Sequence, residues 1–203
     1  QMCIRDRSLS AQAYDSNLTS KDDRISDSLY LDSLYNLSYD LSFYDLDSAL
    51  LVTEKFLSFS RKKNDLNIEL GMTNKGYLHT QIGNQKTALD CFFYVLKLGE
   101  DKGDSTLVSQ AYNDIAMAYM EFREYEKALY YNENSLQISR SQNDLKSISL
   151  TLNNYGLVFL YLENYEKASE VFNEALMLKE NFFEEETDPD EKYYFCLLYT
   201  SPS

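Results

Sequence analysis

Apolar residues recur along the chain at the spacing of amphipathic helices, most clearly between residues 145 and 183. One run of apolar positions ends at Leu162, Asn164 interrupts it, and a second run starts at Tyr165. Residues three and four apart share one face of an α-helix, so each run predicts a helix, and the short interruption predicts an antiparallel hairpin. The apolar positions are Leu145, Ile148, Leu152, Tyr155, Gly156, Phe159 and Leu162, then Tyr165, Ala168, Val171, Phe172, Ala175, Leu176 and Leu178.

This hairpin repeats along the chain at a nearly constant period. Ala49, Ala88, Ala128 and Ala168 occupy the same place in successive copies. A fixed period of about 40 residues is typical of stacked copies of one small unit rather than of a single globular core. We therefore predict an all-α solenoid of four stacked antiparallel helix hairpins over residues 26–183, of which the first copy is the most degenerate.

Composition supports helices and excludes some classes of partner. The 203 residues include only 6 glycines and 2 prolines, so few residues would interrupt a helix. The formal net charge of −14 disfavours nucleic acid, because phosphate binding needs a basic surface. The same charge disfavours anionic membrane surfaces, and no apolar run is long enough to cross a bilayer.

The two ends of the chain do not resemble the rest. Residues 2–7 and 196–201 can be encoded by nucleotide strings that are reverse complements of each other and resemble a sequencing adapter. We interpret residues 1–7 and 196–203 as translated adapter, so that native sequence is expected beyond both ends. Cys91 then remains as the one native cysteine, and no disulfide or metal framework can be built.

The segments next to these ends have open interpretations. Within the polar lead-in of residues 8–25, Ala11 and Ala13 flank Gln12 in the small-x-small form of a signal-peptidase site, which would imply a periplasmic or other extracytoplasmic location. The other interpretation is a lead-in that contains two alanines by chance, in a cytoplasmic protein. Near the other end, Asp188 and Pro189 have the pattern of a helix N-terminus, so residues 184–195 are expected to begin a fifth repeat.

Candidate catalytic and metal-binding groups are few. His79 is the only histidine, and its place in the repeat is that of Tyr119 and Phe159, so we expect a core or near-core role. Cys91 is interpreted as a small packed hydrophobe. The glycine pair that ends at Gly76 falls inside a predicted helix and lacks a following Lys-Ser/Thr, which excludes a phosphate loop. We therefore expect no catalytic site, no metal site and no cofactor in this region.

The repeat resembles the tetratricopeptide repeat family. That family places a small residue in the first helix with an aromatic three residues later, and Ala-x-x-x-aromatic in the second helix. The resemblance covers about residues 26–183 and departs from the pattern at Asn132, where an aromatic is expected. The packing residues that it implies are Gly76, Ala88, Phe92, Ala116, Tyr119, Ala128, Gly156, Phe159, Ala168 and Phe172.

The usual period of that family is shorter, about 34 residues. The longer period resembles the subclass with extended helices, as in kinesin light chains and bacterial tetratricopeptide regulators. HEAT-type arrays also have periods of about 40 residues, but they lack this Gly/Ala/aromatic spacing. The resemblance implies a right-handed superhelix whose first helices line a concave, ligand-binding face.

The resemblance also implies which residues meet a ligand on that face. Asn113 and Asn153 lie one repeat apart and would form a ladder, in which each amide offers a donor and an acceptor to a peptide backbone. The alternative is that both hydrogen-bond between adjacent helices. Lys75 and Lys146 are the only basic residues in the first helices of the three clearest units, so chaperone-tail binding is not expected. The full set is Thr73, Tyr77, Asn113, Met117, Met120, Asn153, Leu157 and Leu160.

These observations favour a scaffold that binds a peptide or protein segment on its concave face, and they do not favour an enzyme. The alternative is the sensor or oligomerisation region of a larger signalling protein, such as a bacterial histidine kinase or transcriptional regulator. An open C-terminal edge would expose an apolar helix face, so self-association is also expected.

Overall fold

The computed structural model describes residues 23–185, with side chains from 27 to 179, and every regular element in that range is an α-helix. The all-α helical-repeat prediction is therefore confirmed. The helices form four hairpins: α2 (Asp23–Leu41) with α3 (Leu46–Lys62), α4 (Ile68–Ile82) with α5 (Gln85–Lys102), α6 (Ser105–Glu121) with α7 (Tyr125–Gln142), and α8 (Leu145–Tyr161) with α9 (Tyr165–Glu185).

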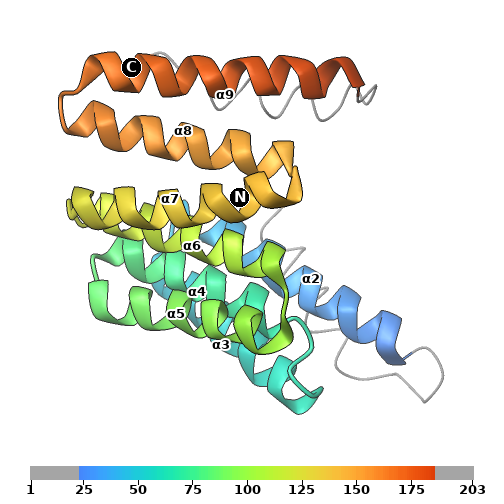
Figure 1. The fold of residues 1–203 in the computed structure, drawn as a ribbon. Helices are drawn as coiled ribbons and strands as arrows, with labels where there is room; N and C mark the ends of the chain where they lie inside the picture. Colours follow the sequence, from blue (N-terminus) through green and yellow to red (C-terminus); the bar gives the residue numbers. More distant parts are fainter. Residues whose placement is uncertain (1–22, 186–203) are drawn as a thin grey trace. The chain divides into compact units, whose positions relative to one another are not determined.

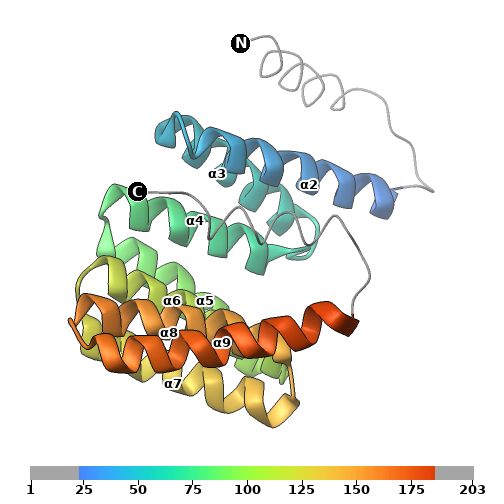
Figure 2. The same cartoon turned by 90° about the horizontal axis from the view of Figure 1, so that it is seen from above.

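The chain divides into two compact units, the first ending at Asp104 and the second beginning at Ser105. In the first unit, α3 packs against α2 and α4, and α4 packs against α5 (Figure 2). In the second unit, α8 lies between α7 and α9 (Figure 1) and also contacts α6. Within each unit, contacts therefore join neighbouring hairpins, as the repeat pattern predicts.

Asparagine and aspartate side chains fix where several helices begin. The Asp144 carboxylate accepts a hydrogen bond from the backbone N–H of Ser147 at 3.0 Å. Asp45, Asn84 and Asn164 cap α3, α5 and α9 in the same way. Each bond satisfies a backbone donor that the first helical turn leaves free, which is why the apolar runs are interrupted at these residues.

Close approach of helices explains the small residues of the repeat. A Cβ atom added to Gly76 would lie 2.5 Å from the ring of Phe92, so α4 and α5 have no room for a side chain at this point. In the third hairpin, Ala116 and Asn132 occupy the positions that correspond to Gly76 and Phe92, and both are buried. A larger residue at the first position is thus accompanied by a smaller one at the second.

Buried hydroxyl and amide groups also join the helices. In the first unit, the Asn74 side chain on α4 donates hydrogen bonds to Ser38 on α2 at 2.9 Å and to Thr53 on α3 at 3.0 Å. In the second unit, Ser135 on α7 is within hydrogen-bonding distance of Ser109 on α6 and Thr151 on α8, at 3.1 Å in each case. Because these polar groups are buried, their mutual bonds offset the cost of removing them from water.

The helix ends differ slightly from the predicted boundaries. Helix α2 begins at Asp23, and α9 continues to Glu185, so Glu184 and Glu185 are helical. The proposed fifth repeat beyond residue 185, the adapter segments 1–7 and 196–203, and the Ala11–Ala13 signal lie outside the described residues. Between residues 23 and 185, no helix is both long enough and apolar enough to span a membrane.

Candidate protein-binding face

The solvent-exposed side of α8 is apolar along most of its length. Leu150, Leu157 and Tyr161 are spaced by seven and four residues, which places them on one side of the helix. Leu150 is 51% exposed, Tyr161 is 57% exposed, and Leu157 is half-buried. Asn153 and Leu160 lie beside this row, and we refer to these five residues as the α8 face. Leu150 and Tyr161 were not among the predicted ligand residues, although their helical spacing from Leu157 could have identified them.

The opposite side of α8 is apolar as well. Ile148 and Leu152 join Leu136 of α7 and Ala175 of α9 in the core of the second unit. Val158 is fully buried. A helix that is hydrophobic all round is normally buried on all sides, whereas α8 leaves one apolar side open to solvent. Packing of the core of this unit therefore does not explain why the residues of the α8 face are apolar.

The two asparagines of the expected ladder have different environments. Asn113 on α6 is 6% exposed, and its Oδ1 accepts a hydrogen bond from Nδ2 of Asn154 on α8 at 3.0 Å. Asn153 is half-buried, and no hydrogen bond among the described residues holds its amide. The structure thus places Asn113 in a bond between helices and leaves the Asn153 amide available to a ligand.

The remaining predicted residues of the second unit differ in accessibility. Met117 on α6 is half-buried, and Met120, one turn further along, is buried. Leu160, which corresponds to Met120 in the next repeat, is 44% exposed. Among the predicted ligand residues of the second unit, the accessible apolar surface therefore lies mainly on α8, with a smaller contribution from Met117.

Thr73 and Tyr77 belong to the first unit and lie on α4. Both are half-buried, and the Tyr77 ring packs edge-on against Phe92 with centroids 5.3 Å apart. Lys75, between them in sequence, forms an ion pair with Glu54 of α3 at 2.5 Å. This ion pair therefore joins α4 to α3.

The predicted packing residues lie inside the hairpins. Phe172 is half-buried and the other nine are buried. Two of the aromatic residues also contact lysine side chains, which was not predicted from the sequence. The Nζ of Lys127 lies 5.0 Å from the ring centre of Tyr119, and that of Lys167 lies 5.3 Å from the ring centre of Phe159. The two lysines lie one repeat apart, as do the two rings, so their shared period was the available signal. Such cation–π contacts attach the start of each second helix to its first helix.

His79 is half-buried and Cys91 is buried. Partial burial lowers the pKa of His79, and its Nδ1 atom has no hydrogen-bond partner among the described residues. Burial also raises the pKa of the Cys91 thiol to about 11, so the reactive thiolate is scarce at neutral pH. Among the residues that the structure describes, no cluster of three or more His, Cys, Asp or Glu side chains could hold a metal ion.

Comparison with solved structures gives the same architecture. BtubC (BKLC) from P. vanneervenii matches with a TM-score of 0.71 and 18% identity, over 93% of this chain and 76% of that one. The apo form of RapI matches with a TM-score of 0.70 and 15% identity, over 98% and 70%. A putative kinesin light chain from Podosopora anserina with TPR-like repeats matches with a TM-score of 0.64 and 12% identity, over 90% and 88%. At these identities the similarity concerns the fold alone.

Sequence comparison identifies the repeat. A comparison with curated proteins gives no match. Residues 107–181 match the family model described as tetratricopeptide repeat. Repeats of this family generally act as non-catalytic scaffolds for protein interaction. The chain is therefore an all-α helical-repeat protein, and residues 107–181, in its second unit, match the tetratricopeptide repeat.

Proposed function

We propose that the second unit binds a peptide or protein segment on the α8 face. The observation that carries the proposal is the exposed apolar row of Leu150, Leu157 and Tyr161. Contiguous exposed apolar surface on a folded protein is typical of an interaction site. Met117 occupies the position on α6 that corresponds to Leu157 and would extend the apolar surface toward α6.

The Asn153 amide gives this surface a means of orienting its ligand. It carries both a donor and an acceptor, and it lies between Leu150 and Leu157 along the helix. We infer that it hydrogen-bonds the ligand backbone, while apolar ligand side chains contact Leu150, Leu157 and Tyr161. Thr73 and Tyr77 are proposed as the corresponding contacts of the first unit.

The test starts from a random-peptide phage library selected against the whole chain. The affinity of a selected peptide is then measured by fluorescence anisotropy for the native chain and for Leu150→Ser and Asn153→Ala. Each variant is expected to weaken binding about tenfold, since truncating a central contact costs about 1.4 kcal/mol or more. Leu51→Ser is the matched control, because Leu51 is an exposed leucine of the first unit and is not one of the residues of the α8 face. Unchanged affinity of every selected peptide in both α8 variants would remove the assignment.

Asn113 provides a second comparison. Because its side chain is bonded to Asn154, Asn113→Ala is expected to lower the melting temperature of the second unit. Asn153→Ala is expected to leave the melting temperature nearly unchanged, since no internal hydrogen bond is lost. If Asn113→Ala weakened peptide binding without lowering the melting temperature, Asn113 would be assigned to the ligand site instead.

A second candidate function, the sensor or oligomerisation region of a larger signalling protein, is favoured by the exposed Leu176. Its counterpart in the preceding repeat is Leu136, which is 5% exposed and packs against Ile148 of the following helix. Leu176 is 52% exposed, so α9 presents the same apolar position without a following helix among the described residues. The candidate predicts a mass that rises with concentration in sedimentation and falls in Leu176→Lys but not in the control Met177→Lys. A monomer at all concentrations would exclude an oligomerisation region.

A further inference from the structure

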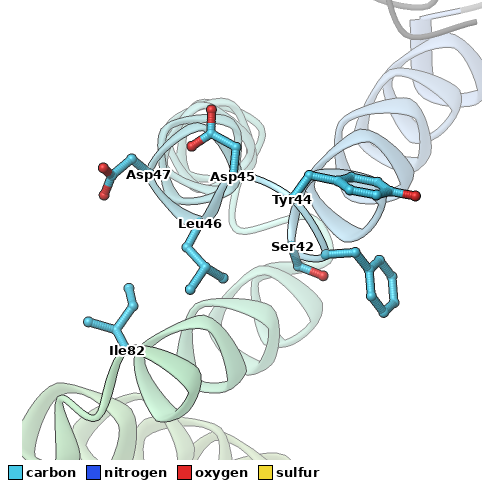
Figure 3. A pocket seen from close by; sticks show the side chains of 7 residues that line it. Ser42, Tyr44, Asp45, Leu46, Asp47 and Ile82 are labelled. Atoms are coloured by element: carbon cyan, nitrogen blue, oxygen red, sulfur yellow. The ribbon is translucent and has the colours of Figure 1, made fainter. Parts of the chain in front are cut away.

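The first unit contains a hollow at the turn between α2 and α3. Its volume is about 580 Å³, and it is bounded by this turn, the start of α3 and the end of α4. Figure 3 shows Leu46 and Ile82 pointing toward one another from α3 and α4, with Asp45 and Asp47 above them. The hollow is an open depression that combines two aliphatic side chains, half-buried Leu46 and exposed Ile82, with carboxylates beside them.

Aromatic side chains next to the hollow are unusually exposed for a helical hairpin turn. Tyr44 is 81% exposed and Phe43 is 66% exposed. Their rings are in edge-on contact with centroids 6.4 Å apart, and Phe43 makes a similar contact with Tyr39 at 5.1 Å. No other hairpin turn of the described chain has an aromatic residue just before the N-cap of its second helix; there the chain has Gly83, Arg123 and Glu163. Core packing does not account for these exposed rings.

The rim of the hollow is negatively charged because it carries the carboxylates of Asp45 and Asp47. Asp45 accepts two hydrogen bonds from Ser48, which hold its pKa below the ordinary range and keep it ionised at neutral pH. Asp47 is exposed and forms no ion pair among the described residues. Among the described residues, no lysine or arginine lines the hollow. A cationic ligand would therefore be attracted both locally and by the net charge of −14.

We propose that this hollow is a second docking site, which binds a peptide segment with an aliphatic side chain flanked by lysine or arginine. The aliphatic side chain would lie between Leu46 and Ile82. The basic side chains would pair with Asp47 and contact the face of the Tyr44 ring, an arrangement that favours arginine. The site shares no residue with the α8 face, since its lining residues belong to the first unit.

The test is an NMR titration of the ¹⁵N-labelled whole chain with three amidated pentapeptides, GRLRG, GRARG and GELEG. GRLRG is expected to shift the amide signals of residues 42–47 and Ile82 in a saturable way. Replacing its leucine by alanine removes the apolar contact and is expected to weaken binding about tenfold. GELEG is expected to cause no shift, and added salt is expected to weaken GRLRG binding. Equal shifts with GELEG would overturn the proposal.

Variants of the chain test whether GRLRG binds at the hollow. Tyr44→Ser and Asp47→Asn are expected to reduce GRLRG affinity several-fold, and both residues are exposed, so the variants should fold. Leu51→Ser and Asp101→Asn change an exposed leucine and an exposed aspartate of the same unit outside the hollow, and they should bind normally. Equal loss in the control pair would show non-specific attraction and overturn the proposal. Shifts at residues 42–47 that depend on protein concentration without peptide would assign the hollow to a second copy of the chain instead.

The two binding sites can be tested separately. Leu150→Ser alters the α8 face and is expected to leave the GRLRG shifts unchanged. A negative result for the hollow therefore does not contradict the proposal for the α8 face. A negative result for the α8 face likewise does not contradict the proposal for the hollow.

Discussion

A Cβ atom added to Gly156 of α8 would lie 2.6 Å from Cε1 of Phe172 on α9, well inside van der Waals contact. The glycine therefore allows the aromatic ring to pack directly on the α8 backbone. Gly76 and Phe92 have the same relationship in the second hairpin. In each pair, any side chain larger than the glycine hydrogen would collide with the ring unless the two helices moved apart.

Gly156→Ala is accordingly expected to lower the free energy of unfolding by about 1–3 kcal/mol, the usual cost of overpacking a core. Phe172→Leu in the same chain should recover part of the loss, because the shorter side chain makes room for the methyl group. Urea denaturation followed by circular dichroism measures both. An alanine variant as stable as the native chain would show that the helices separate without cost.

Asn132→Leu is expected to stabilise the second unit. The Asn132 side chain is 1% exposed, and within residues 23–185 neither its Oδ1 nor its Nδ2 has a hydrogen-bond partner. Leucine has a similar size and no polar atoms to leave unpaired, so a gain of about 1–3 kcal/mol is expected. Asn154→Leu is the control, and it should lose stability because it breaks the bond to Asn113. Thermal melts distinguish the two; destabilisation by Asn132→Leu would contradict the prediction.

Glu163→Gly is expected to raise the free energy of unfolding, because glycine adopts the left-handed backbone conformation of this position without strain. Glu163 has φ of 59° and Arg123 has φ of 61°, at the turn position where the second hairpin has Gly83 with φ of 80°. A left-handed conformation costs a non-glycine residue about 1–2 kcal/mol, and the greater freedom of glycine in the unfolded chain offsets about 0.4–1 kcal/mol of this. A net gain of about 0.5–1 kcal/mol follows. Glu163→Ala should show no gain, and equal melting of the glycine and alanine variants would count against the backbone explanation.

His79→Phe is expected to remove one source of acid sensitivity. Burial lowers the folded pKa of His79 below its ordinary value of 6.5, with a further contribution from Lys75. The neutral form is therefore favoured in the folded state, and the unfolded chain binds a proton first as the pH falls. The stability due to His79 is complete above pH 6.5 and is lost as the pH falls through the folded pKa.

The measurement for His79 is the melting temperature as a function of pH. Phenylalanine fits the place in the repeat that Tyr119 and Phe159 occupy, and it does not titrate. The native chain should lose more stability than His79→Phe between about pH 8 and 5.5. Parallel curves for the two proteins would show that His79 has the same pKa in the folded and unfolded states.

Much of the fold could be predicted from the sequence because its causes are local. The return of Ala128 one repeat later as Ala168 indicates one hairpin stacked on a copy of itself. Asn164 interrupts an apolar run, and its side chain caps the helix that follows. Helical spacing and capping act over a few residues, so they can be read without knowing which helices are neighbours.

The candidate sites depended on tertiary structure. Asn113 and Asn153 occupy equivalent places in the sequence, yet Asn113 is bonded to Asn154 while the Asn153 amide remains unbonded among the described residues. Leu136 and Leu176 are equivalent as well, and only Leu136 is covered by a following helix among the described residues. Periodicity determined which side chains share a face, but exposure of that face depends on the neighbouring helices, and these contacts form only when the chain folds.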